Sequence, residues 1–349
     1  MGKDGEMSEI ILLSPEKKQY KANLHCHSVR SDGNLTPDEL KALYKGAGYS
    51  ILAITDHCSP KSHSELSDGD FLLLTGYEAY IRPTETGRSD PFRPEIHLNL
   101  FAREPENETF ICYNEKYAKY IPKEKHAELC RAGSEEPRRY TVEYINKFIK
   151  TAEENGYLVA YNHPFWSMEG EERVLLYENL FSLEMYNTSS YMLNNIEGAE
   201  ALYDTMMRRG MRIGCHAGDD NHNGPSGNDS LGWYTVFLAD ELSYPEIIRA
   251  MDEKSFYASN GPRFKKISVI SKEDKKMLHI ECTEAAKAFM YFGSKMPCFK
   301  RFPEGQTATF FDFPIDERAN YVRVSIYDAE GRVANSRGFF RDEWDGLWK

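Results

Sequence analysis

The stretch that decides the fold is "NLHCHSVRSDG" (residues 23–33), in which an apolar run ends in two histidines one residue apart. Successive residues of a strand point to opposite sides, so His25 and His27 face one side while Cys26 points away. Asp32 follows five residues after the second histidine. Neutral imidazoles and ionised carboxylates are ligands that suit zinc, iron and manganese. The stretch therefore predicts a strand that ends at a metal site.

Similar apolar runs recur along the chain and alternate with helical patterns. Short apolar runs in which polar and apolar residues do not alternate regularly are typical of strands buried on both faces. Between them, "TPDELKALYKGAG" begins with a capping box of Thr36 and Glu39, and "SYPEIIRAMDE" repeats that pattern with Ser243 and Glu246. Strands that alternate with helices over about 250 residues predict an α/β barrel or a related closed sheet. The runs are "YKANLHC", "SILAITDH", "FLLLTGYEA", "EIHLNLFA", "YLVAYNHP", "FSLEMYN", "MRIGCHAGDD" and "GWYTVFLA".

Two regions do not follow this alternation of apolar runs and helical patterns. Residues 103–139 are polar and poor in strand signals, and a loop of this length is typically functional or disordered. We interpret it as an inserted loop that could act as a lid. From residue 262 onward, alternating strands are separated by turn residues and helical patterns are absent. We therefore expect a large domain over residues 1–261 and a small antiparallel β domain over residues 262–349.

The composition of the chain argues against several classes of protein. A formal net charge of −12 on 349 residues argues against stable, non-specific nucleic-acid binding, which needs clustered Lys and Arg. The apolar runs are far shorter than the ~20 residues of a membrane span, and the N-terminus does not resemble a secretory signal. The seven scattered cysteines form no CxxC pair, which favours reduced thiols in the cytoplasm.

Most of the apolar runs end in a histidine or a carboxylate. A lone histidine at a strand end is more often a hydrogen-bonded structural residue than a ligand, and HxH alone is a weak signal. Six such features in order are stronger evidence, because the C-terminal strand ends of a barrel gather on one face. Clustered carboxylates without cations would repel one another. The residues at these ends are His25, His27, Asp56, His57, Glu78, His163, Asp219, Asp220 and His222, with His97 near the start of its run.

These motifs resemble the PHP (polymerase and histidinol phosphatase) metal-dependent phosphoesterases over about residues 20–260. The resemblance rests on "HCHSVRSDG", "TPDELKALYKGAGYSILAITDH", "TGYEA", "EIHLNLFA", "NHP" and the D-x-H of "GDDNH". It implies a distorted (β/α)7 TIM-like barrel with two to three divalent transition-metal ions (Zn, Fe or Mn) at the strand ends. The absence of a polymerase region in the sequence argues against the polymerase-associated role of some relatives.

Position by position, the resemblance assigns ligands to three ions. The first ion would be held by His25, His27, Glu78 and Asp220. Glu78 would bridge to a second ion, which His97 and His163 complete. The D-x-H pattern selects Asp220 over its neighbour Asp219. The third ion would be held by Asp32, His57 and His222.

Other polar residues near these motifs carry weaker expectations. Asp56 is expected to orient a histidine or to cap a helix. Arg30 could hold a phosphate through its bidentate fork, although a solvated arginine is an equal interpretation. His216 could donate to a phosphate, although a structural role is favoured.

The resulting hypothesis is hydrolysis of a small phosphorylated substrate, a phosphomonoester or nucleotide-like molecule, by a metal-bound hydroxide. Glu78, Asp220 and His222 are the expected catalytic residues. One alternative keeps the site but cleaves a carboxyl ester, amide or carbamate, since no ligand distinguishes these bonds. Another alternative is a non-catalytic metal-containing binding protein. The substrate, the native metal and the oligomeric state stay open.

Overall fold

The computed structural model describes residues 8–83, 89–224, 228–272 and 275–345. The chain is a mixed α/β protein in which strands and helices alternate in the first part and strands dominate the last part. Among the described helices, none combines the length and apolar character that a membrane span requires.

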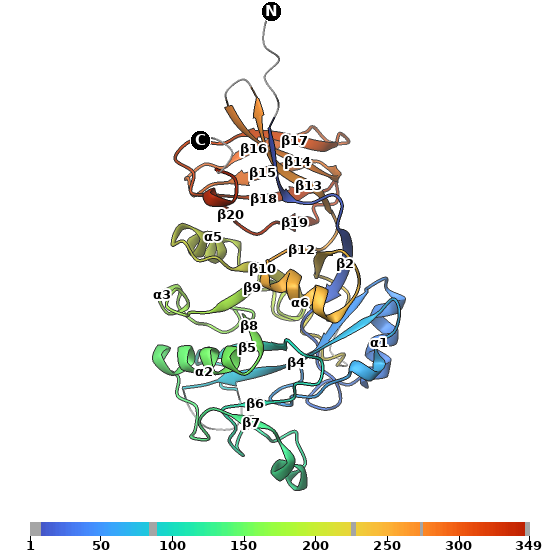
Figure 1. The fold of residues 1–349 in the computed structure, drawn as a ribbon, viewed down its shortest axis with the longest axis vertical. Coiled ribbons are helices and arrows are strands. Elements are labelled where there is room, and N and C mark those ends of the chain that lie inside the picture. The colour runs from blue at the N-terminus through green and yellow to red at the C-terminus, as the bar shows by residue number, and fades with distance from the viewer. Residues whose placement is uncertain (1–7, 84–88, 225–227, 273–274, 346–349) are drawn as a thin grey trace, which may run out of the picture.

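A 14-stranded sheet runs through most of the molecule. Figure 1 shows it passing from the helix-bearing part into the strand-rich end. In spatial order its main path is β10 (Gly214–Gly218), β9 (Leu180–Asn187), β8 (Tyr157–Tyr161), β5 (Ile96–Ala102), β4 (Leu72–Ile81), β3 (Ile51–Ile54), β2 (Lys18–Asn23), β11 (Tyr234–Ala239), β12 (Phe256–Ser259), β19 (Val333–Asn335), β18 (Tyr321–Tyr327), β15 (Lys287–Tyr291) and β16 (Cys298–Arg301), while β20 (Phe339–Phe340) pairs with β18.

The sheet is only partly parallel, which differs from the parallel barrel expected from the sequence. Strands β2, β3 and β4 pair in parallel, as do β8, β9 and β10. Strand β5 is antiparallel to both β4 and β8, and β11 is antiparallel to β2. The described part of the connection from β4 to β5, residues 82–83 and 89–95, contains no helix, and a parallel crossover usually needs one. Because β5 runs the opposite way, its first residues, including His97, lie at the edge where β4 ends.

A second sheet joins the two ends of the chain. Its order is β1 (Glu9–Leu13), β13 (Phe264–Lys272), β14 (Lys275–Ala285) and β17 (Ala308–Pro314), all antiparallel. Strand β1 comes from the first of the two expected ranges and pairs with β13 from the second. In Figure 1 this sheet lies at the strand-rich end of the molecule.

The helices begin where capping residues satisfy their free backbone groups. Thr36 accepts a hydrogen bond from Glu39 N, and the Glu39 carboxylate accepts one from Thr36 N, so the predicted capping box is confirmed. The second predicted box is wrong, because Ser243 makes no capping bond and Glu246 pairs with Arg249. The α-helices are α1 (Pro37–Gly46), α2 (Val142–Glu154), α3 (Glu171–Val174), α4 (Thr188–Asn194), α5 (Glu200–Arg208) and α6 (Tyr244–Asp252), and the 3-10 turns are η1 (Ser64–Leu66), η2 (Lys123–Glu128) and η3 (Arg341–Glu343).

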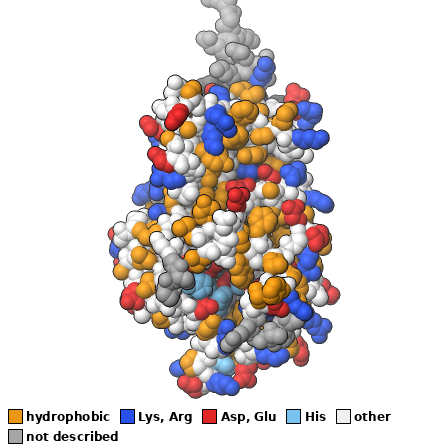
Figure 2. Space-filling model, turned by 180° about the vertical axis from the view of Figure 1, so that it is seen from behind, with side chains coloured by type: hydrophobic (Ala, Val, Ile, Leu, Met, Phe, Trp, Pro, Cys, Tyr) orange, Lys and Arg blue, Asp and Glu red, His pale blue; other side chains and the backbone are white. Residues whose placement is uncertain are grey.

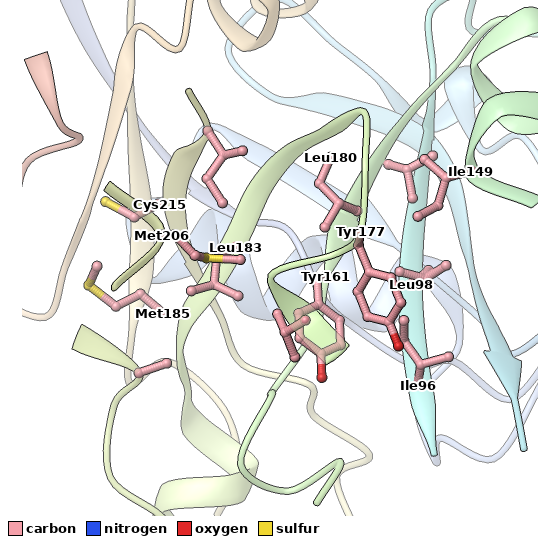
Figure 3. Packing of buried hydrophobic residues seen from close by; sticks show 14 of the residues in the cluster. Ile96, Leu98, Ile149, Tyr161, Tyr177, Leu180, Leu183, Met185, Met206 and Cys215 are labelled. Carbon is pink, nitrogen blue, oxygen red and sulfur yellow. The ribbon is translucent and has the colours of Figure 1, made fainter. Parts of the chain in front are cut away.

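The largest apolar core lies between strands β5, β8, β9 and β10 and the helices that cover them. Figure 3 shows Ile149 of α2 beside Leu98 of β5, and Met206 of α5 beside Leu183 of β9. These side chains are buried, and burial of apolar area is the main stabilising contribution of such layers. The core thereby fixes the strands whose ends carry the polar residues.

The inserted segment 103–139 is ordered in the structure. It contains β6 (Phe110–Ile111) and β7 (Arg131–Ala132), which form a small parallel sheet, and the turn η2. Its Phe110 and Tyr117 pack with Cys58 and Tyr80 in a buried cluster. This packing attaches the segment to the ends of β3 and β4.

Candidate metal centre

Polar side chains from the ends of several strands converge in one place. His25 and His27 follow β2, and their ring centres are 5.3 Å apart. Cys26 between them is buried in an apolar cluster, as expected from strand alternation. His57 follows β3 and forms a bridge pair with Glu78 of β4. In Figure 2, histidine side chains come together on one face beside acidic side chains.

A first group of donors is centred on Asp220. Its Oδ1 lies 3.2 Å from His25 Nε2 and 3.0 Å from His27 Nε2. Glu78 Oε1 lies 3.2 Å from His25 Nε2. One ligand atom of each of these four residues lies within 4.8 Å of the others. The four residues are those expected around the first ion.

A second group surrounds the buried carboxylate of Glu78. Its Oε1 lies 3.0 Å from His97 Nδ1 and 3.3 Å from His163 Nε2. Its Oε2 lies 2.8 Å from His57 Nδ1. Asn162 Nδ2 donates a hydrogen bond to Oε1 at 2.8 Å. Glu78 therefore belongs to two donor groups, one with His25, His27 and Asp220 and one with His57 and His97. His163, which was expected at the second ion, instead forms a donor group with His25 and Glu184.

A third group lies on the solvent side of His27. Asp32 Oδ1 lies 3.6 Å from His27 Nδ1 and 3.5 Å from His222 Nε2. Asp32 Oδ2 lies 3.6 Å from His57 Nε2. Tyr120 of the inserted segment donates a hydrogen bond to Asp32 at 3.2 Å. The expected third ligand set is thus brought together, and the inserted segment reaches it.

The donor atoms are spaced as the ligands of one metal ion would be, and several of them lack a hydrogen-bond partner. Two ligand atoms that each lie ~2.1 Å from one ion are about 3.0–3.4 Å apart. Short N···O distances without hydrogen-bond geometry fit shared coordination, and buried polar atoms are otherwise almost always hydrogen-bonded. The buried donor atoms with no hydrogen-bond partner include His25 Nε2, His27 Nε2, His57 Nδ1, Glu78 Oε2 and His97 Nε2.

Electrostatics keep the carboxylates ionised. Burial alone would raise the pKa of Glu78, but His97 and His25 hold it well below its usual value. The pKa of Asp220 is lowered in the same way against its burial, chiefly by His25 and His27. Burial lowers the pKa of His97, but Glu78 outweighs it and raises the pKa to about 10. The buried, ionised carboxylates therefore need nearby positive charge to be stable, and bound divalent ions would provide it.

The adjacent acids Asp219 and Asp220 have different surroundings. Asp219 is fully buried and accepts hydrogen bonds from the hydroxyls of Tyr44 (2.7 Å) and Thr188 (2.6 Å) and from the amides of two residues near 231. Burial raises its pKa to about 6. Asp220 has φ +54° and points its carboxylate toward His25. Only Asp220 belongs to a donor group, as the D-x-H pattern predicts.

Two further acids approach the histidines and were not singled out in the sequence. Glu184 of β9 lies 3.0 Å from His25 Nδ1 and accepts a hydrogen bond from His163 N at 2.9 Å. It forms a donor group with these two histidines. Glu95 lies 3.3 Å from His97 Nε2. A carboxylate inside the apolar run "FSLEMYN" was the only sequence signal for Glu184.

Asp56 orients the turn that follows His27. Its carboxylate accepts hydrogen bonds from Ser28 N at 2.8 Å and from the hydroxyls of Ser28 and Ser31 at 2.6 Å. It belongs to none of the donor groups among the described residues. The structure thus gives it a supporting position beside the histidine turn.

The two weaker candidates for substrate contact differ in accessibility. Arg30 is exposed and lines a cavity of about 920 Å³ together with Lys61 and Tyr120. His216 is fully buried, stacks on Phe181 and lies 2.8 Å from the hydroxyl of a neighbouring serine. Its burial lowers its pKa to about 4. His216 is thus buried away from solvent, which fits the structural role that was favoured for it over a phosphate contact.

Several solved structures are similar to this chain. A two-domain protein from Bacteroides vulgatus that contains a predicted PHP-like metal-dependent phosphoesterase is 14% identical, with a TM-score of 0.41, over 95% of this chain and 98% of that one. A metal-dependent phosphoesterase described from Bifidobacterium adolescentis is 15% identical, with a TM-score of 0.35, over 67% of this chain and 96% of that one. An amidohydrolase from Chromobacterium violaceum is 15% identical, with a TM-score of 0.41, over 67% and 96%.

No protein-family model and no curated protein matches the sequence. The similarity is therefore found among solved structures, two of which carry a PHP-like or metal-dependent phosphoesterase description.

Proposed function

We propose that the chain is a metal-dependent hydrolase that cleaves a phosphate ester of a small molecule. The observation that carries the proposal is the continuity of the donor groups, which share His25, His27, His57 and Glu78. Structural histidines would each be satisfied by their own partner, whereas these share carboxylates and leave buried nitrogens without hydrogen bonds.

We propose that these residues hold two to three divalent ions. When bound, such ions lower the pKa of a coordinated water and stabilise negative charge that develops on phosphoryl oxygens. Glu78 would set the distance between two neighbouring ions, because its two oxygens face different histidines. Zinc, iron and manganese all suit this mixture of imidazole and carboxylate.

We propose roles for three residues in the hydrolysis of the ester. A water oxygen forms a bond to phosphorus while the bond to the alcohol oxygen breaks, and a proton reaches that oxygen. Asp220 would orient the attacking water, since it lies between His25 and His163 in the centre of the site. His222 is partly exposed and lies 3.5 Å from Asp32, so it could supply the proton when the third ion is not bound.

We also propose that the strands around the centre form the distorted TIM-like barrel. The terminal strand β10 contacts β11 and β12, although it is paired only with β9 in the hydrogen-bonded order. Thr235 of β11 hydrogen-bonds to the backbone of Ala217 of β10 through its hydroxyl. These contacts support closure of the sheet around the polar strand ends.

A carboxyl ester, amide or carbamate hydrolase is the second candidate. It is favoured by one observation, the cavity beside His163 and Glu184, whose described lining contains no Lys or Arg to hold a phosphoryl group. The same donors could activate water for attack on a carbonyl carbon.

The test combines metal analysis with a pair of substrates. The purified protein should contain two to three equivalents of transition metal and should release nitrophenol faster from 4-nitrophenyl phosphate than from 4-nitrophenyl acetate. Glu78→Gln should remove this activity, whereas Glu154→Gln on the exposed face of α2 should not. Full activity of Glu78→Gln would refute the proposed mechanism, and a preference for the acetate would favour the second candidate.

A further inference from the structure

A cavity of about 350 Å³ opens directly from the candidate metal centre. Its inner wall includes His163, Glu184 and Asn187. Asn187 Nδ2 donates a hydrogen bond to Asp220 at 3.2 Å, so this wall is continuous with the donor groups. A substrate whose reacting bond lies at the centre would therefore place one of its two sides in this cavity.

Several aromatic side chains line the rest of the cavity. Trp233 stacks on Tyr186 with ring centres 3.7 Å apart and planes 3° from parallel. Phe165 and Tyr191 also line the cavity, and they are 43% and 50% exposed. Exposed aromatic faces beside a polar site are suited to a flat or ring-shaped ligand, because aromatic side chains contribute both apolar area and stacking.

The charges that line this cavity are all negative. Glu184 faces the histidines, while Glu197 and Glu200 lie farther along the lining. Glu200 accepts a hydrogen bond from the hydroxyl of Tyr186. Among the described residues, no Lys or Arg pairs with Glu197 or Glu200. An anionic group in the cavity would meet uncompensated carboxylates, so its binding would be unfavourable.

We propose that this cavity takes the alcohol part of the substrate and selects a ring-bearing alcohol that carries no negative charge. The inference rests on the proposed phosphoesterase function and names the substrate class of that site. The phosphoryl group would lie at the donor groups, and the ring would lie against Trp233 and Tyr191. Neutral and cationic rings would be accepted, whereas a ring with a carboxylate or a second phosphate would be disfavoured.

The strand-rich end of the chain supplies a further part of the wall of this cavity. Tyr327 at the end of β18 and Val333 of β19 line it, together with Gly331 between them. Asn335 Nδ2 donates a hydrogen bond to the Tyr186 hydroxyl at 2.7 Å, which ties β19 to the aromatic pair. The C-terminal strands thus contribute to selection of the alcohol and provide no donor atom to the described metal groups.

The alternative place for the alcohol is the cavity of about 920 Å³ on the Asp32 side of the centre. Arg30, Lys61 and Lys125 line it together with three glutamates, of which Glu108 pairs with Lys61 and Glu128 pairs with Lys125. Among the described ion pairs none involves Arg30, so an anionic alcohol could pair with this residue. The two cavities therefore predict opposite responses to charge on the substrate, which makes the choice between them measurable.

The experiment uses the metal-loaded full chain and three phenyl phosphates that differ only in the para group: carbamoyl (neutral), aminomethyl (cationic) and carboxyl (anionic). We expect kcat/KM for the carboxyl compound to be about fivefold or more below that for the carbamoyl compound, as expected for a carboxylate near two others. Dissociation constants of the matching benzylphosphonates, measured by calorimetry, should follow the same order without any turnover.

Two variants assign the preference to this cavity. Glu197→Lys should raise the carboxyl-to-carbamoyl ratio of kcat/KM about fivefold or more. The same charge change at Glu178→Lys, an exposed residue outside the cavity lining, should leave the ratio unchanged. Tyr191→Ala should weaken binding of all three ring compounds about threefold and leave methyl phosphate unaffected, because stacked aromatic contacts are of that magnitude.

The outcomes separate this inference from the proposed function. Hydrolysis of the phosphates with no penalty for the carboxyl compound, or with a ratio that Glu197→Lys does not change, would overturn the inference and leave the phosphoesterase proposal intact. A preference for the carboxyl compound would place the alcohol in the cavity beside Arg30. Release of phosphate from none of the esters would overturn the proposed function and this inference with it.

Discussion

The carboxylate of Glu184 lies 3.0 Å from Nδ1 of His25, on the side of the ring opposite Nε2, which faces Asp220. This contact determines which nitrogen of His25 is free. A proton on Nδ1 is donated to Glu184, and the lone pair of Nε2 is left for a metal ion. Glu184 is fully engaged, since it also accepts hydrogen bonds from His163 N and Asn187 Nδ2.

Glu184→Gln is therefore expected to weaken metal binding about 10- to 100-fold, the usual effect of losing such a supporting carboxylate. The neutral amide still fills the space but no longer increases the basicity of His25. Competition with a chelator of known affinity measures the change, and Glu178→Gln, on the exposed surface, is the control. Unchanged metal affinity would show that Glu184 does not act through His25.

The adjacent acids provide a second test, because they differ in role although they are neighbours in the sequence. Asp220→Asn should remove at least one equivalent of bound metal, since its Oδ1 lies 3.2 Å from His25 Nε2 and 3.0 Å from His27 Nε2. Asp219→Asn should keep the metal and lower the free energy of unfolding by about 1–3 kcal/mol, because an amide group then faces buried donors. Metal analysis and urea unfolding distinguish the two variants. Loss of metal in Asp219→Asn together with full metal content in Asp220→Asn would show that the roles of the two acids are exchanged.

Gly218 offers a third test through close packing. A Cβ on this residue would lie 2.7 Å from His25 Cβ and 2.9 Å from Glu184 Oε1. Gly218→Ala should therefore displace the His25–Glu184 pair, with a cost of about 1–3 kcal/mol in unfolding free energy and weaker metal binding. Gly46→Ala is the matched control, because nothing lies within 4 Å of its added Cβ. Equal stability and metal affinity in both variants would contradict the geometry.

Much of the convergence of polar residues could be predicted from the sequence, because residue type and position at a strand end are both local properties. His25, His57 and His163 each follow a buried apolar run, and the structure brings all three together. The chain direction of a strand is not local. The reversed direction of β5 depends on its pairing with β4 and β8, although His97 reaches the same edge.

Glu184 could not be found in this way, because its direction depends on register. The pairing of β9 with β10 shifts between His216 and Ala217, and that with β8 shifts between Val159 and Ala160. Such bulges change which side chains face the site, and no local pattern predicts them. The pairing of β1 with β13 is similarly long-range and was not anticipated in the expected division of the chain.

The last prediction concerns the link between the strand-rich end and the helix-bearing part. Arg323 of β18 is 1% exposed and forms a bidentate pair with Asp204 of α5, at 2.5 and 2.7 Å. It also donates to Ser325 and Asn335 at 3.2 Å. Arg323→Met should lower the free energy of unfolding by about 3 kcal/mol, because it leaves a largely buried carboxylate without its partner.

The metal content of Arg323→Met should not change, since none of the described donor groups includes a residue of the C-terminal strands. Arg318→Met is the control, because Arg318 pairs with Asp316 on the surface with 90% of its side chain exposed, and exposed pairs contribute little to stability. Urea unfolding and metal analysis of both variants make the comparison. Loss of a metal equivalent in the folded Arg323→Met protein would mean that the strand-rich end holds the donor groups in place and does not merely support the wall of the cavity.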